Sequence, residues 1–246
     1  MRRTLSDQEI PDMVDTSDLN GLDPYDLLDA EAARIDAYLS SLPTGEWARP
    51  SRCAGWSVRD VAAHLAATET YHHACLDGRA RELFEAMAAR GVSGLSEANE
   101  LGVRDRDGVP NDEVVAEWRT ADADTRHRMR GRDGGDMDSS VGPYPVRLQA
   151  FHVASELAIH ADDMHVPITA QEAGARWAWR ARFSRFAVKE SGGDVAVGPR
   201  DGSTTVRVNG VDHTLDDAVF VEAVAGRPVP DGAVADEVAA ALSLTP

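Results

Sequence analysis

Apolar residues recur every three or four positions in four stretches of the chain, which is the spacing of one buried face of an α-helix. These stretches predict helices at residues 23–41, 58–76, 111–128 and 145–164. The intervening stretches 91–110 and 131–145 are rich in Gly, Asp, Ser or Pro and are predicted to be loops. Four helices joined by loops favour a mainly α fold, with an antiparallel four-helix bundle over residues 21–167.

Two of the predicted helices carry clear start signals. Asp23 can accept hydrogen bonds from the first free N–H groups, and Pro24 suits the first helical position. Ser57 is followed three residues later by Asp60, which resembles a capping box with a shorter acid. Both helices are therefore predicted to begin directly after these caps.

The pattern changes after Pro167. Residues 168–190 predict a linking helix, which carries the aromatic residues Trp177, Trp179, Phe183 and Phe186. Alternating β-branched residues and turn glycines then predict short strands, followed by helices near 216–225 and 233–242. Residues 191–246 are thus predicted to form a small α+β domain. A unit of about 55 residues is near the lower limit for independent folding, so we expect it to dock on the bundle.

Charge and composition narrow the set of partners. Residues 1–20 are polar, acidic and without periodicity, and they predict a flexible acidic arm. The whole chain of 246 residues has 42 Asp and Glu against 25 Lys and Arg, a formal net charge of −17. Such a surface repels phosphate backbones and anionic membranes, so neither nucleic acid nor membrane is an expected partner. A small anionic substrate stays possible, because one local arginine can override the overall field.

The distribution of apolar residues and cysteines suggests a cellular compartment. No apolar run approaches the roughly 20 residues of a membrane span, and none follows the basic start as in a signal peptide. Cys53 and Cys75 form neither a disulfide framework nor a metal clip, and both are expected to be structural. These features predict a cytoplasmic protein, either a monomer or a homodimer.

An acidic residue precedes a histidine by four positions three times, in the pairs Asp60/His64, Glu69/His73 and Glu156/His160. Residues at this spacing lie on one helix face and can share a metal ion, although they also form ordinary surface ion pairs. The pair Glu69/His73 lies in a polar run near the end of its helix. We expect this pair to be solvated.

The other two pairs predict a metal site. His64 lies beside apolar positions of its helix, and Glu156 with His160 is deep in another apolar helix, where a glutamate requires a partner. His64, Glu156 and His160 together would leave a coordination position open, as in catalytic zinc sites, and would also suit non-haem iron. Asp60 has two possible roles, either fixing the other ring nitrogen of His64 or only completing the helix cap.

The residues of these two helices resemble a known family. Gly55–His64 reads Gly-Trp-Ser-Val-x-Asp-x-x-x-His, and Glu156–Asp163 reads Glu-x-x-x-His-x-x-Asp. Both motifs resemble those of the mycothiol-dependent maleylpyruvate isomerase family, a branch of the DinB-type metal-binding bundles. The resemblance covers about residues 22–165 and, more loosely, the C-terminal part.

The resemblance implies site residues and cofactors. It assigns the metal ligands to His64, Glu156 and His160, and implies that Asp163 contacts a ligand without binding the metal itself. The alternative is that Asp163 is only a polar residue at the end of the helix. It implies zinc as the ion, although another divalent metal is possible, and mycothiol, the low-molecular-weight thiol of actinobacteria, as cosubstrate. The protein itself is expected to supply no nucleophile, since the exogenous thiol or a metal-bound water takes that role.

Four further residues are candidates for lining the substrate pocket. His152 is eight positions before His160, about 12 Å along a helix, so one ion cannot bind both side chains. We interpret His152 as a pocket or core histidine. Arg147, Arg79 and Arg81 are candidates for binding the substrate, and each is alternatively a surface residue.

These inferences predict a metal- and thiol-dependent enzyme that acts on a small electrophile. Zinc would deprotonate the thiol, and the thiolate would add to a conjugated cis double bond. Rotation and elimination then give the trans isomer, whereas S-transfer needs only the addition. Two alternatives stay open: a metal hydrolase that uses bound water, and a non-catalytic, metal-stabilised binding or regulatory protein.

Overall fold

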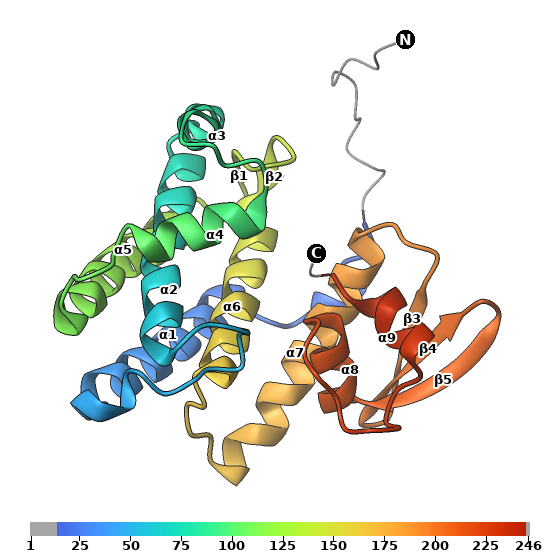
Figure 1. Cartoon of the computed structure of the whole chain (residues 1–246). Coiled ribbons are helices and arrows are strands. Elements are labelled where there is room, and N and C mark those ends of the chain that lie inside the picture. Colours follow the sequence, from blue (N-terminus) through green and yellow to red (C-terminus); the bar gives the residue numbers. More distant parts are fainter. Residues whose placement is uncertain (1–13, 245–246) are drawn as a thin grey trace. The chain divides into compact units, whose positions relative to one another are not determined.

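The computed structural model describes residues 14–244 and is mainly helical, with a small antiparallel sheet in its C-terminal part (Figure 1). The chain divides into two compact units. One is Asp23–Pro167, and the other combines the described residues before Asp23 with those from Ile168 onward. No helix in the described range is long and apolar enough to cross a membrane.

The first unit contains helices at all four predicted positions: α1 (Pro24–Ser41), α2 (Val58–Leu76), α5 (Asn111–Gly131) and α6 (Val146–Asp163). Helix α1 packs against α5 and α6, and α2 packs against the same two helices. Both predicted starts are confirmed. Asp23 accepts hydrogen bonds from the N–H groups of Tyr25 and Asp26, and Ser57 with Asp60 forms a complete capping box.

The region between α2 and α5 differs from the prediction. The predicted loop at 91–110 contains α4 (Leu95–Arg104), and α3 (Ala80–Ala89) precedes it. Both helices are short and mostly exposed, so they lack the long apolar stripe that identifies a core helix from sequence. Gly102 permits α4 to approach α2, since a Cβ at this position would collide with the side chain of Ala67.

The remaining short elements lie in connections. A 3₁₀ helix, η2 (Thr44–Glu46), follows α1. The predicted loop at 131–145 holds a pair of two-residue strands, β1 (Asp136–Met137) and β2 (Tyr144–Pro145), which are antiparallel. This pair leads directly into α6, where two of the candidate site residues lie.

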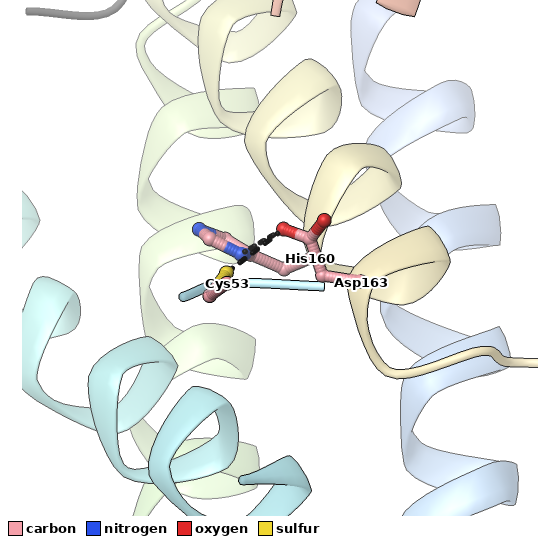
Figure 2. A group of neighbouring side chains, drawn as sticks. All are labelled: Cys53, His160 and Asp163. Atoms are coloured by element: carbon pink, nitrogen blue, oxygen red, sulfur yellow. Dashed lines mark hydrogen bonds and ion pairs between the residues drawn. The ribbon is translucent and has the colours of Figure 1, made fainter. Parts of the chain in front are cut away.

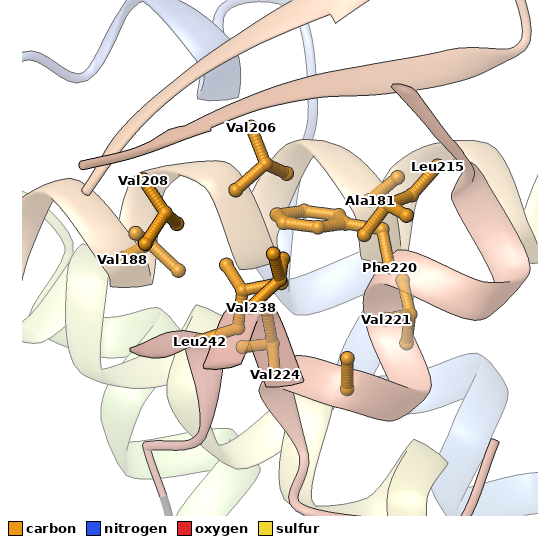
Figure 3. Close-up of a cluster of buried hydrophobic side chains, with 11 residues drawn as sticks. Ala181, Val188, Val206, Val208, Leu215, Phe220, Val221, Val224, Val238 and Leu242 are labelled. Atoms are coloured by element: carbon orange, nitrogen blue, oxygen red, sulfur yellow. The ribbon is translucent and has the colours of Figure 1, made fainter. Parts of the chain in front are cut away.

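The second unit builds one apolar core from a helix, a sheet and two further helices (Figure 3). Its elements are α7 (Ala170–Glu190), β3 (Ala196–Arg200), β4 (Ser203–Val208), β5 (Val211–Asp216), α8 (Asp217–Val224) and α9 (Asp236–Leu242). The strands form an antiparallel sheet in the order β3–β4–β5. Val206 and Val208 of β4 are buried while Arg207 between them is exposed, which is the period-two pattern of a half-buried strand.

Helix α7 belongs to this second unit, although the sequence suggested a separate linking helix with a boundary at residue 191. Its Ala181 and Val188 lie in the same buried cluster as Phe220 of α8, and Trp177 packs against that cluster. The boundary between the two compact units therefore lies before α7, at Pro167, because this helix covers the apolar side of the C-terminal elements. Docking of this unit on the helices of the first unit stays a prediction.

The described end of the predicted acidic arm is held in place rather than loose. Residues Ser17–Leu19 form a 3₁₀ helix, η1, that packs against α7. Asp18 is only 8% exposed, because its carboxylate accepts hydrogen bonds from Arg185 and Lys189, both at 2.7 Å. These buried ion pairs could not be anticipated from a polar segment without periodicity. Residues 1–13 of the predicted arm lie outside the described part of the chain.

Candidate metal centre

Two helices bring together the three residues that the sequence singled out. His64 lies in the second turn of α2, while Glu156 and His160 are one turn apart on α6. One ligand atom from each side chain lies within 4.8 Å of the others. The Nε2 atom of His64 is 3.5 Å from Oε1 of Glu156, and the rings of His64 and His160 meet edge to face with centroids 4.8 Å apart. These three side chains, the trio, could hold one metal ion.

The surroundings of the trio set its protonation. Burial lowers the pKa of His64, which keeps the imidazole neutral at pH 7. Burial alone would raise the pKa of Glu156, but the hydrogen bond from His64 and the nearby histidines outweigh it and lower this pKa to about 2. A neutral imidazole and an ionised carboxylate are the forms that bind a metal ion. The Glu156 side chain is 31% exposed, so the trio is open to solvent on one side.

Asp163 fixes the orientation of His160, as Figure 2 shows. Its carboxylate is fully buried, and Oδ2 lies 3.1 Å from Nδ1 of His160. Because an ionised carboxylate only accepts hydrogen bonds, this contact assigns the proton to Nδ1 and leaves the lone pair on Nε2. The contact has the geometry of the carboxylate–histidine pair that supports many metal sites, and this role of Asp163 stays a prediction.

Cys53 is a member of this cluster that the sequence reasoning missed. Its thiol donates a hydrogen bond of 3.2 Å to the same Oδ2 atom of Asp163 (Figure 2). A compact turn before α2 places it there, since the N–H of Arg52 donates to the backbone carbonyl of Asp163. Cys53 precedes Asp163 by 110 residues, so no local spacing could have revealed the contact. The prediction that Cys53 is structural is compatible with this hydrogen bond and stays a prediction.

The comparison with protein families fits this geometry. A family model described as the mycothiol maleylpyruvate isomerase N-terminal domain matches residues 28–165, which is more than half of the chain. The chain belongs to this family. The matched region contains the trio, Cys53 and Asp163, and the resemblance seen in the sequence is confirmed. No curated protein and no solved structure was found to match the chain.

Of the two roles considered for Asp60 in this family member, the structure favours the helix cap. Its Oδ2 accepts hydrogen bonds from the backbone N–H and the hydroxyl of Ser57, at 2.8 and 2.7 Å. Among the described residues, no hydrogen bond or ion pair joins Asp60 to His64. The carboxylate is turned toward the start of the helix because the cap satisfies an N–H group that has no partner within α2.

Two of the other predicted pocket residues, Arg147 and Arg79, lie away from the trio. Arg147 is thirteen residues before His160 on α6, about 20 Å along the helix, and it pairs with Asp133. Arg79 lies beyond the end of α2, where it is exposed and pairs with Asp77 at 2.6 Å. Arg79 also lines a cavity of about 480 Å³ between α2, α3 and α5.

Two further candidates have simple surroundings. Arg81 is exposed on α3. His152 is half-buried, and its Nε2 atom lies 3.2 Å from the hydroxyl of Tyr144 on β2. This position agrees with the interpretation of His152 as a pocket or core histidine.

The expectation that Glu69 is solvated is wrong. Glu69 is 2% exposed and His72 is 3% exposed, and Oε2 of Glu69 lies 3.4 Å from Nδ1 of His72. Thr125 of α5 donates a hydrogen bond to the same carboxylate oxygen. The partner predicted from the i,i+4 spacing, His73, instead contacts the backbone carbonyl of Ala121. Helix α2 packs against both α5 and α6. Glu69 lies on the side that α5 covers, and it is therefore buried.

This buried polar cluster holds protons more tightly in the folded state. Burial and the charge of Glu69 raise the pKa of Asp122 to about 6, although Arg126 opposes the shift. Burial alone would lower the pKa of His72, but the neighbouring Glu69 outweighs it and raises this pKa. Both shifts stabilise the folded state below the unfolded pKa, and this stabilisation is lost as the pH rises through the folded pKa.

We therefore expect the free energy of unfolding to fall between pH 5 and pH 7.5. A shift of Asp122 from its usual value to about 6 corresponds to a loss of about 1 to 2 kcal/mol over that range. The substitution Asp122→Asn removes this part of the pH dependence, whereas Asp124→Asn, at a half-exposed position of the same helix, leaves it unchanged. Urea denaturation at pH 5 and pH 7.5 gives the change in the free energy of unfolding for each protein. The same change in wild type and in Asp122→Asn would contradict the prediction.

Proposed function

We propose that this chain is a metal-dependent enzyme that uses mycothiol to isomerise or S-conjugate a small electrophile. The observation that carries the proposal is the trio, with two histidines and one carboxylate on facing helices and solvent access beside Glu156. Three protein ligands leave a coordination position for an exogenous ligand. Family membership supports a thiol as that ligand. We further propose that α1, α2, α5 and α6 form the DinB-like four-helix bundle, which their mutual packing supports.

The residues present fit a divalent ion, which we propose to be zinc. His64 and His160 would bind it through neutral imidazole nitrogens, and Glu156 through an ionised carboxylate. When bound, the ion would supply the charge that lowers the pKa of a thiol and makes thiolate available at neutral pH. Asp163 holds the proton of His160 on Nδ1, so that the lone pair of Nε2 would be available to the ion. The ring of Trp56 packs against that of His64, with centroids 5.2 Å apart.

The described part of the protein favours an external nucleophile. Cys75 is buried, and burial raises its pKa to about 11, so its thiol stays protonated at neutral pH. The thiol of Cys53 donates a hydrogen bond to the buried carboxylate of Asp163, which holds the proton on sulfur. The proposed step forms a bond between the mycothiol sulfur and a carbon of a conjugated cis double bond. Rotation about the resulting single bond and loss of the thiol give the trans isomer, whereas an S-conjugate is the product when the adduct is released.

The test is an assay of the purified, zinc-loaded protein on an acid with a conjugated cis double bond, such as maleylpyruvate, with and without mycothiol. We expect formation of the trans isomer or of an S-conjugate that requires both mycothiol and bound metal, as followed by NMR. His64→Ala is expected to abolish it, and His127→Ala, at an exposed site on α5, is the matched control. Turnover without thiol would instead favour a metal hydrolase, and metal binding without any turnover would favour a binding or regulatory protein.

A further inference from the structure

A second group of metal-ligand atoms lies directly behind the trio. Sγ of Cys53, a carboxylate oxygen of Asp163 and a ring nitrogen of His160 all lie within 4.8 Å of one another (Figure 2). Sγ is 3.2 Å and Nδ1 is 3.1 Å from the same Oδ2 atom. Asp163 is fully buried, the His160 side chain is 12% exposed, and Cys53 is half-buried. The group thus contains one sulfur, one nitrogen and one oxygen donor, and Cys53 gives access from solvent.

The spacing of these atoms suits a tetrahedral cation. Typical zinc bonds to sulfur, nitrogen and oxygen place neighbouring ligand atoms about 3.3 to 3.6 Å apart. The separations of Sγ and of Nδ1 from Oδ2, 3.2 and 3.1 Å, are only slightly shorter, as expected when hydrogen bonds occupy the place of an ion. A site that includes a thiolate favours thiophilic ions over Mg²⁺ or Ca²⁺.

We propose that Cys53, Asp163 and His160 form a second position for a thiophilic divalent cation such as Cd²⁺ or Zn²⁺, which shares His160 with the trio. The cation binds Sγ, a carboxylate oxygen and Nδ1. The thiol proton passes to solvent, and the imidazole proton moves from Nδ1 to Nε2. His160 then presents an N–H group toward His64 and Glu156, so the two positions compete for one imidazole. The inference rests on the proposed function only through the shared residue His160.

Cadmium titration of the metal-free, full-length protein tests the second position. A Cd²⁺–thiolate bond gives an ultraviolet charge-transfer absorbance that histidine and carboxylate ligands do not produce. We expect this absorbance in the wild type and in Cys75→Ser, whose thiol is buried elsewhere, and its loss in Cys53→Ser. Glu156→Ala should keep it, because Glu156 belongs to the trio alone. Cadmium binding without this absorbance in the wild type, or unchanged absorbance in Cys53→Ser, would overturn the proposal.

A measurement on the wild type keeps the proposal testable if Cys53→Ser fails to fold. Bound Cd²⁺ is expected to protect Cys53 from alkylation by iodoacetamide, with the modified peptide quantified by mass spectrometry. Equal alkylation of Cys53 with and without Cd²⁺ would contradict the second position. The variant Glu156→Ala separates failure of the second position from failure of the proposed function. Loss of zinc from this variant with the Cys53 absorbance retained concerns the trio alone, whereas loss of the absorbance concerns the second position.

Discussion

Replacing His160 by alanine is expected to remove the bound divalent ion from the purified protein. The wild type should hold about one such ion per chain at the trio. His160→Ala deletes a ligand to that ion and leaves the fully buried carboxylate of Asp163 without one of its hydrogen-bond donors. His64→Ala deletes the ligand that comes from α2 and is expected to have the same effect. Metal analysis of the purified variants measures the outcome.

Controls and a graded variant sharpen this test. His73→Ala and His127→Ala should keep the ion, because His73 contacts α5 and His127 is exposed. Asp163→Asn should retain the three ligands but weaken metal affinity by about 10- to 100-fold, as is typical for the partner of a metal-binding histidine. Full metal occupancy in His160→Ala would contradict the assignment of the trio as the metal ligands.

Ending the chain at Glu190 is expected to be more damaging than ending it at Pro167. The longer fragment keeps α7 but loses the strands and helices that cover its Ala181 and Val188. Buried Arg185 also loses its hydrogen bond to Thr204 and its ion pair with Asp217. The fragment that ends at Pro167 removes α7 together with the C-terminal elements that cover its apolar side, so this side is not left exposed.

Solubility and melting temperature compare the two fragments. We expect the fragment ending at Glu190 to aggregate more readily, because it exposes a contiguous apolar surface. Both fragments contain His64, Glu156 and His160, so their metal content should reflect folding of the first unit alone. Equal solubility of the two fragments, together with melting like that of the full chain, would show that α7 needs no cover from the C-terminal elements.

The local sequence was sufficient for the four long helices of the first unit, although not for α3 and α4, and it singled out the three residues of the trio. Asp23 and Ser57 bond to backbone groups only two or three residues away, so their caps are properties of the local chain. Glu156 and His160 share a face because a helix repeats every 3.6 residues. That His64 joins them was inferred from its apolar neighbours and from the family motifs. The prediction of the trio therefore depended on both helical periodicity and the resemblance to the family.

Long-range packing decided the rest, because contacts between distant segments leave no local pattern. Cys53 reaches Asp163 only through the turn before α2, and Glu69 is buried only because α5 covers that side of α2. From the sequence, Asp60 could accept a hydrogen bond either from the helix cap or from His64, and only the orientation of its side chain in the structure distinguishes the two. Helix α7 reads as an isolated amphipathic segment, and its membership of the second unit follows from the apolar cluster that it completes. The sequence thus determined the long helices and the candidate ligands, and the tertiary structure determined which polar groups meet between those helices.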